Sequence, residues 1–328
     1  MSSTVPTSAR EEKTLVQRLD QFILRVSPFN QVLGLTRTML AIATALTLAA
    51  TPNDQLFFRS VNYPEGVVCG RGLGQWTLYC LTGGSRYFDL VVWGSVLVLL
   101  VVATGFAPRW TAIPHWYIAW SFAASSPIPD GGDHITTNLA LLLVPLCLLD
   151  RRRWHWSPDT TYHQRSVGVK FAAYGAIALW ILQIFVLYFQ AAVAKFGVTE
   201  WADGSALWYW MQNPTFGPAG WMRDLALGIL QYPLFVLLVT YGTLLFQVTL
   251  AFSPLYSWGW RRFYLFAAVV FHLGIAVTMG LWSSSIAMIA ADLIFLIRPH
   301  ESLHVPWLSR LWQVGRERVL SLSGRSHS

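Results

Sequence analysis

Lys195 is the residue best placed for acid–base chemistry, because it ends a long apolar run that contains Ala191, Ala192 and Ala194. Small side chains let a neighbouring helix approach closely, so the lysine could lie against protein rather than lipid. A lysine removed from water holds its proton less tightly and can then act as a general base. The alternative is a lysine whose amine extends to water at the end of a helix.

A second group of polar residues is the stretch Asp130-Gly131-Gly132-Asp133-His134. Asp130, Asp133 and His134 lie three and four positions apart, so they share one face of a helix that starts there. One interpretation is a polar cluster at the mouth of a cavity, with both aspartates and the histidine as catalytic candidates beside Lys195. The other is a capped helix, in which an aspartate accepts free backbone N–H groups and the glycines form the turn. Both interpretations remain open.

His272 and Asp292 each lie inside an apolar run. An ionisable residue at bilayer depth is costly, so each must find a partner within the protein. A satisfied structural hydrogen bond is the favoured interpretation for both. His115 stands beside Trp116 and Tyr117, which predicts a position at the membrane interface.

The three cysteines divide into a buried residue and a pair. Cys147 falls within an apolar run and is predicted to be a small buried residue. Cys69 and Cys80 share one predicted outside loop, where oxidising conditions allow a disulfide. Such a bond would stabilise the fold by about 3 kcal/mol in chain-entropy models. A dithiol that exchanges with a substrate is the alternative, although no Cys-x-x-Cys motif supports it. The cysteines lack zinc-site spacing, so no metal site is predicted.

The composition predicts a polytopic membrane protein. Apolar residues make up 54% of the 328 residues and charged residues 12%, about half the ~25% usual for soluble domains. Mean hydropathy is +0.45, and the 17 tryptophans suit a chain that meets the bilayer surface repeatedly. The net charge of +7 does not indicate a nucleic-acid partner, because the basic residues lie between and beyond the apolar runs. The expected partner is the lipid bilayer, with the chain in a cell membrane.

The apolar runs predict an all-α bundle of about eight spans, since crossing a bilayer takes roughly 20 helical residues. The expected spans are 33–50, 87–106, 112–126, 135–149, 168–194, 225–251, 263–281 and 284–298. The third and fourth are short, which fits tilted helices, helices bordered by interfacial residues, or a re-entrant hairpin. Three regions follow: an amphipathic cytoplasmic segment over 1–32, the bundle over 33–298, and a basic cytoplasmic tail over 299–328.

The basic residues also predict the orientation of the bundle. With the amino terminus inside, 18 of the 23 Lys and Arg residues lie on the cytoplasmic side and five on the outer side. Both termini are therefore expected in the cytoplasm. The long loops 51–86 and 195–224 are then outside, and the basic, aromatic loop 150–167 is inside.

Several motifs resemble the sporulation-delaying protein SdpB family. They are Gly105-Phe106-Ala107-Pro108-Arg109, His115-Trp116-Tyr117, Ser125 to Asp133, Leu149-Asp150-Arg151 with Trp154-His155-Trp156, and Gly280-Leu281-Trp282. The similarity runs over nearly the whole chain. That family belongs to the HTTM group, whose bundle is shared with vitamin K-dependent gamma-glutamyl carboxylase. The resemblance implies a bacterial membrane protein that works with a small partner protein to mature a secreted peptide toxin.

The resemblance to the carboxylase is narrower and is centred on Lys195. Tyr188-Phe189, Ala191, Lys195, Trp201 and Gly204 match the carboxylase segment around its catalytic lysine. That lysine starts oxygenation of a hydroquinone, and the strong base so formed removes a proton from glutamate. The match implies lysine-initiated chemistry, with a reduced quinone as the cofactor and His134 near the site. This chain carries Ala194 where the carboxylase has a second lysine.

Two functions therefore remain open. One is a membrane enzyme for exported antimicrobial peptides, with its site at the outer leaflet around Lys195, Asp130, Asp133 and His134. The other is a non-catalytic subunit that exports the peptide, protects the cell from it, or anchors a complex. Whether Lys195 faces the interior of the bundle or lipid and water discriminates between them.

Overall fold

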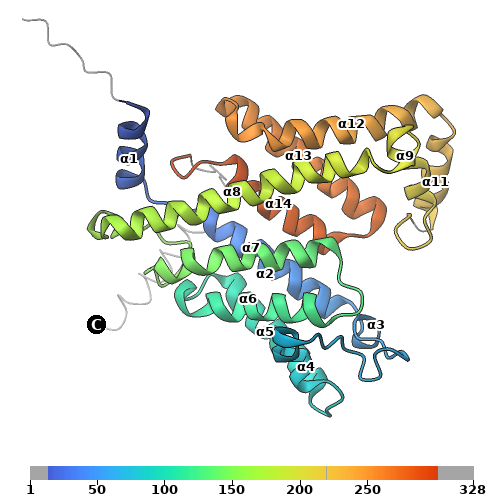
Figure 1. Ribbon diagram of the computed structural model, residues 1–328, viewed down its shortest axis with the longest axis horizontal. Helices are drawn as coiled ribbons and strands as arrows, with labels where there is room; N and C mark the ends of the chain where they lie inside the picture. The colour runs from blue at the N-terminus through green and yellow to red at the C-terminus, as the bar shows by residue number, and fades with distance from the viewer. Residues whose placement is uncertain (1–13, 219, 302–328) are drawn as a thin grey trace, which may run out of the picture.

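The computed structural model describes residues 14–218 and 220–301, and this part of the chain is helical (Figure 1). The longer helices, in chain order, are α1 (Leu15–Arg25), α2 (Gln31–Ala50), α5 (Phe88–Thr104), α6 (Pro108–Ser125), α7 (Gly131–Leu149), α8 (Val167–Lys195), α11 (Trp221–Leu230), α12 (Pro233–Ala251), α13 (Trp258–Met279) and α14 (Trp282–Leu296). The shorter ones are α3 (Asn53–Leu56), α4 (Leu78–Thr82), α9 (Thr199–Ala202) and α10 (Ala206–Gln212). The all-α prediction is confirmed.

Five of these helices are long and apolar enough to cross a membrane, namely α2, α7, α8, α12 and α13. Two shorter apolar helices, α5 and α14, accompany them. The prediction of a helical membrane protein is confirmed at this level. The count of eight spans and the orientation stay predictions.

Helix boundaries differ from the expected spans in two places. The run 225–251 was expected to be one helix, but α11 ends at Leu230 and α12 begins at Pro233. Proline has no N–H to donate and its ring clashes with the preceding turn, so it is favoured in the first turn of a helix over the interior. The two short spans were also underestimated, because α6 and α7 have 18 and 19 residues.

Helix α8 runs through the middle of the molecule, between α12 and α13 on one side and α7 on the other (Figure 1). It packs on α12, α7 and α14, while α2 packs on α14, α5 and α7. The main apolar core lies between α8, α14, α7 and α2, with Trp180 fully buried at its centre. A second core joins α2, α5 and α6 to Tyr79 of α4.

The loop that was expected outside carries a disulfide. Cys69 and Cys80 are bonded, with their Cα atoms 5.6 Å apart. Two hydrogen bonds hold the same loop to the end of α6: Val68 N–H donates to the Ser125 carbonyl at 2.8 Å, and the Thr77 and Ser125 hydroxyls are 2.6 Å apart. The loop is therefore folded onto the bundle, although 51–86 holds only short helices.

The amphipathic segment over 1–32 contains α1, whose start is capped by Thr14 and Gln17. The chain after α1 is fixed to α8, because the Tyr174 hydroxyl donates to the Val26 carbonyl at 3.1 Å. Residues 1–13 of this segment and 302–328 of the predicted basic tail lie outside the described residues.

Candidate functional site

Lys195 is half-buried at the last turn of α8. Its Nζ donates to the Ala191 carbonyl at 2.8 Å and to Oε1 of Gln247, on α12, at 3.0 Å. The same nitrogen lies 5.3 Å from the centre of the Trp201 ring. The lysine therefore faces the protein rather than extending freely into water.

Lys195 has no carboxylate partner within 4.0 Å among the described residues. An ammonium group has three protons to donate, and here two go to neutral carbonyl-type oxygens. The third side is open to the face of Trp201, which attracts a cation only weakly. An amine held by neutral acceptors can lose and regain a proton without breaking an ion pair, as a general base must.

A buried polar triad lies two helical turns below Lys195 on α8. The Tyr188 hydroxyl donates to Asp292 Oδ1 at 2.8 Å and lies 3.0 Å from His272 Nε2. All three side chains are buried. Seven residues are close to two turns, so Tyr188 and Lys195 lie on the same face of α8, about 10 Å apart along its axis.

The triad joins three helices, since Tyr188 comes from α8, His272 from α13 and Asp292 from α14. The expectation that His272 and Asp292 find partners in the bundle is met by these contacts. Buried polar groups that are fully bonded specify one arrangement of the helices around them. The triad thereby fixes the rotation of α8, and with it the direction in which Lys195 points.

The Asp130–Asp133 pair has a helix-capping geometry at the start of α7. Asp133 N–H donates to Asp130 Oδ1 at 2.9 Å, and Asp130 N–H donates back to Asp133 Oδ2 at 3.0 Å. The Ser284 hydroxyl donates to Asp130 Oδ2 at 2.6 Å. A Cβ on Gly132 would lie 2.4 Å from Ser284 Cα, so only glycine permits this contact between α7 and α14.

The two groups of predicted site residues thus have different partners. Lys195 bonds to Gln247 of α12, whereas Asp130 bonds to Ser284 of α14. His134 is exposed, and none of the described hydrogen bonds connects it or the aspartates to Lys195. Lys195 with Gln247 and the aspartates with Ser284 are therefore two separate polar groups in the described part of the chain.

Two buried residues were missed or misplaced by sequence reasoning. His115 was expected at the interface, but it is only 1% exposed, and its Nε2 has no hydrogen-bond partner among the residues that the structure describes. That prediction was wrong, because its tryptophan and tyrosine neighbours point to other sides of α6. Arg37 of α2 is also 1% exposed, and its position inside an apolar run was the available signal.

Arg37 reaches the loop after α7. Its Nη1 lies 3.4 Å from the Val102 carbonyl and 3.4 Å from His155 Nδ1, and its Nη2 donates to the Thr111 hydroxyl. Burial, followed by the charges of Arg37 and Arg152, lowers the pKa of His155 to about 3. The imidazole is therefore neutral at physiological pH.

The same loop packs closely on the end of α5. His155 N–H donates to the Gly105 carbonyl at 3.0 Å, and Trp156 Nε1 donates to the Thr104 carbonyl at 2.9 Å. Gly105 has φ of +87°, and a Cβ there would lie 2.3 Å from the His155 ring. Two motifs that were separate in the sequence, around Gly105 and around His155, therefore form one structural unit.

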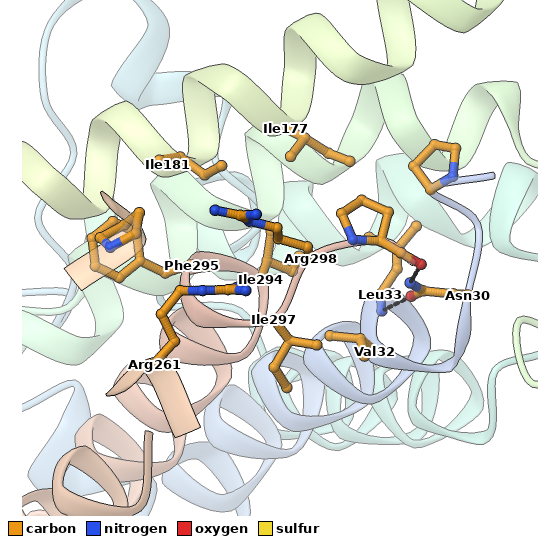
Figure 2. Close-up of a pocket in the computed structure, with 13 residues that line it drawn as sticks. Asn30, Val32, Leu33, Ile177, Ile181, Arg261, Ile294, Phe295, Ile297 and Arg298 are labelled. Carbon is orange, nitrogen blue, oxygen red and sulfur yellow. Dashed lines mark hydrogen bonds between the residues drawn. The ribbon is translucent and has the colours of Figure 1, made fainter. Parts of the chain in front are cut away.

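A small cavity of about 110 Å³ lies beside the middle of α8 (Figure 2). Ile177 and Ile181 of α8 line it, together with Arg261 of α13. Ile181 precedes Lys195 by 14 residues, which is about 21 Å along a helix. This cavity is therefore too far away to hold a substrate of Lys195. Within the described residues, no group of three His, Cys, Asp or Glu side chains could hold a metal ion.

Comparisons with known proteins give two bacterial relatives, both from Bacillus subtilis (strain 168). The protein YitO is 32% identical over 290 residues, which cover 87% of this chain and 91% of YitO. The sporulation-delaying protein SdpB is 29% identical over 317 residues, covering 95% of this chain and 96% of SdpB. No protein-family model matches the chain, and no solved structure matches it.

Proposed function

The chain belongs to the family of SdpB and YitO, and on that premise we propose that it takes part in producing or maturing an exported antimicrobial peptide. SdpB is a sporulation-delaying protein by name, and its similarity extends over almost the full length of both chains. The proposed partners are a secreted peptide substrate and a small partner protein. The proposed setting is the cell membrane, in which the helices of this chain are embedded.

We further propose eight crossings with both termini in the cytoplasm. The five long apolar helices, with α5, α6 and α14, supply the eight segments that this arrangement needs. Reporter fusions near positions 60, 158, 210 and 320 are expected to lie outside, inside, outside and inside. Reporters at 158 and 210 on the same side would contradict the arrangement.

The proposed reaction centre is Lys195, acting as a general base at the outer end of α8. The observation that carries this proposal is a half-buried amine held by Gln247 and a backbone carbonyl, without a carboxylate partner in the described part of the chain. A neutral amine in this position accepts a proton from a group placed against it. Gln247 keeps the amine oriented as its charge changes.

We propose a reduced quinone, which the carboxylase resemblance implies, as the cofactor of this site. Lys195 and the Trp201 ring, 5.3 Å apart, would hold it through an amine and an aromatic face. A quinol bound there supplies an acidic hydroxyl and reducing equivalents. The proposed role of this chain is to accept that proton and hold it at Lys195 Nζ.

Exchange of Lys195 tests the proposal. Lys195→Ala is expected to abolish peptide maturation while leaving membrane insertion and the Cys69–Cys80 bond intact. Lys195→Arg is expected to fail as well, because a guanidinium stays protonated at any working pH. Maturation is measured by mass spectrometry of the secreted peptide. An active Lys195→Arg variant would refute the proposal that Lys195 is a general base.

The competing function is a non-catalytic subunit for export, immunity or scaffolding. It is favoured by the aspartate pair and the buried triad, whose polar groups bond to one another and leave no reactive group free. In this case, Lys195→Arg supports full peptide production, and the peptide leaves the cell chemically unaltered. The same mass measurement therefore discriminates between the two functions.

A further inference from the structure

A hollow of about 400 Å³ lies where α6 begins and α7 ends. Arg109 and Trp110 of α6 line one side, and residues 150–153, which follow α7, line the other. Its volume is within the ~300–1,000 Å³ usual for small-molecule sites. Four of the lining residues are arginines, so the hollow suits an anion.

The two sides of this hollow are joined through the backbone. Ala107 N–H donates to the Arg153 carbonyl at 2.7 Å, and Phe106 and Trp154 form an isolated antiparallel bridge. The rings of Phe106 and Trp154 also meet edge to face, with centroids 5.2 Å apart. The arginines are thus presented by a fixed scaffold.

The charge in the hollow is largely uncompensated. Arg152 binds Asp150 through Nε at 3.0 Å and Nη2 at 2.8 Å, so both oxygens of this buried carboxylate are used. Arg109, Arg151 and Arg153 are exposed, and the structure gives them no carboxylate within 4.0 Å among the residues it describes. Three positive charges therefore face the hollow without a counter-charge.

The start of α6 adds to the attraction for an anion. This 18-residue helix begins at Pro108, and its first turn borders the hollow. Pro108 has no N–H and Trp110 N–H already donates to the Ala107 carbonyl at 2.9 Å, so the helix end contributes mainly the partial positive charge of the helix dipole. A phosphate at this place would meet both the guanidinium groups and the helix end.

The surroundings of the hollow are apolar and aromatic. Trp110 is 79% exposed and Trp154 is 40% exposed, and such side chains lie at the headgroup level of a bilayer. An adjoining hollow of about 210 Å³ shares Arg109 and Arg151, and it is lined further by apolar Leu148, Leu149 and Val169 and by polar Gln164, Arg165 and Ser166. A ligand with a phosphate and an apolar part could occupy both hollows, whereas a free phosphate could occupy only one of them.

We propose that this arginine site binds the headgroup of an anionic phospholipid. Basic pockets between membrane helices are suited to such headgroups. The leaflet would be the cytoplasmic one under the proposed orientation, but the site itself does not depend on that orientation or on the chemistry of Lys195.

Purified full-length protein in a zwitterionic detergent provides the test. Phosphatidylglycerol is titrated against the protein, and binding is followed by native mass spectrometry and by the rise in Tm. The triple variant R109Q/R151Q/R153Q is compared with R59Q/R71Q/R223Q, which removes the same charge from exposed arginines elsewhere. Each arginine near a membrane surface contributes about a fivefold gain in affinity, so the first variant is expected to lose on the order of a hundredfold. The control is expected to bind like the unmodified chain.

Two further probes separate the sources of the phosphate. Phosphatidylcholine is expected not to raise Tm, and millimolar inorganic phosphate is expected not to displace phosphatidylglycerol. Equal losses in the two triple variants would overturn the proposal, because binding would then follow net charge alone. Equal binding of phosphatidylcholine, or displacement by inorganic phosphate, would also overturn it.

Discussion

Charged side chains have different kinds of partners at the two ends of the bundle. At the end where α7 stops, Arg152 is bound to buried Asp150, and Arg37 lies against His155 and the end of α5. At the end where α8 stops, Lys195 bonds to two neutral oxygens and faces the Trp201 ring, with no carboxylate within 4.0 Å in the described part of the chain. The first arrangement stabilises a fold, since every contact is lost on unfolding. The second holds an amine without an ion pair among the described residues, which is the arrangement that the proposed base requires.

By the same comparison, the Asp130–Asp133 pair has a structural role. It lies at the same end of the bundle as Lys195, yet its contacts resemble those of the other end, because it caps α7 and accepts a hydrogen bond from Ser284 of α14. Substitutions can therefore separate stability from reactivity. The expected loss of unfolding free energy is largest for the Asp150–Arg152 ion pair and smallest for Lys195.

Removal of the Asp150 carboxylate is expected to have the largest effect. Asp150→Ala leaves Arg152 buried without a counter-charge, which costs about 3–5 kcal/mol of unfolding free energy. Exposed Asp224, replaced by alanine, serves as the control and should change stability by less than about 0.5 kcal/mol. Thermal unfolding in detergent measures both. Equal Tm values for the two variants would contradict the structural role of this end.

The contact between α7 and α14 gives the next largest effect. Gly132→Ala places a methyl group 2.4 Å from Ser284 Cα, and the helices must separate at a cost of about 1–3 kcal/mol. Gly131→Ala is the matched control, because a Cβ there has no neighbour within 4 Å. A Gly132→Ala protein as stable as the Gly131→Ala protein would mean that the two helices do not meet as described.

The sequence alone was sufficient to predict most of the helices. It also offered the capped-helix interpretation of Asp130, which the structure shows. The apolar runs are long and local, and a capping aspartate followed three residues later by an acid is a short-range pattern. Pro233 was an equally local signal, but it was not used, and the sixth span was therefore placed too early.

The partners of the buried polar residues could not be predicted in this way. His272 and Asp292 were identified one by one, but Tyr188 joins them across 84 and 104 residues of sequence. Arg37 was counted only as a charge for orientation, and His115 was placed at the interface. Which residues meet depends on how the helices rotate and pack, and the local patterns used to predict helices do not report this.

Stability is expected to fall below neutral pH because of His155. Its pKa is lowered to about 3 in the folded chain, whereas an unfolded histidine titrates near ~6.5. Between these values the unfolded state binds the extra proton, so stability rises with pH. From pH 7 to pH 5.5 the loss is about 1 kcal/mol. Thermal unfolding at several pH values measures it, and His155→Gln should flatten the slope. An unchanged slope in that variant would assign the effect to other groups.

Lys195 is expected to give the smallest change in stability. Lys195→Gln breaks no ion pair, and the shorter amide can still donate to Gln247, so the unfolding free energy should change by less than about 1 kcal/mol. Peptide maturation should nevertheless be lost, since an amide cannot accept a proton as an amine does. Thermal unfolding and mass analysis of the secreted peptide are measured on the same variant. A stability loss as large as that of Asp150→Ala would mean that Lys195 is a structural residue like those at the opposite end. If the Lys195→Gln variant still matures the peptide, Lys195 has no role in the reaction.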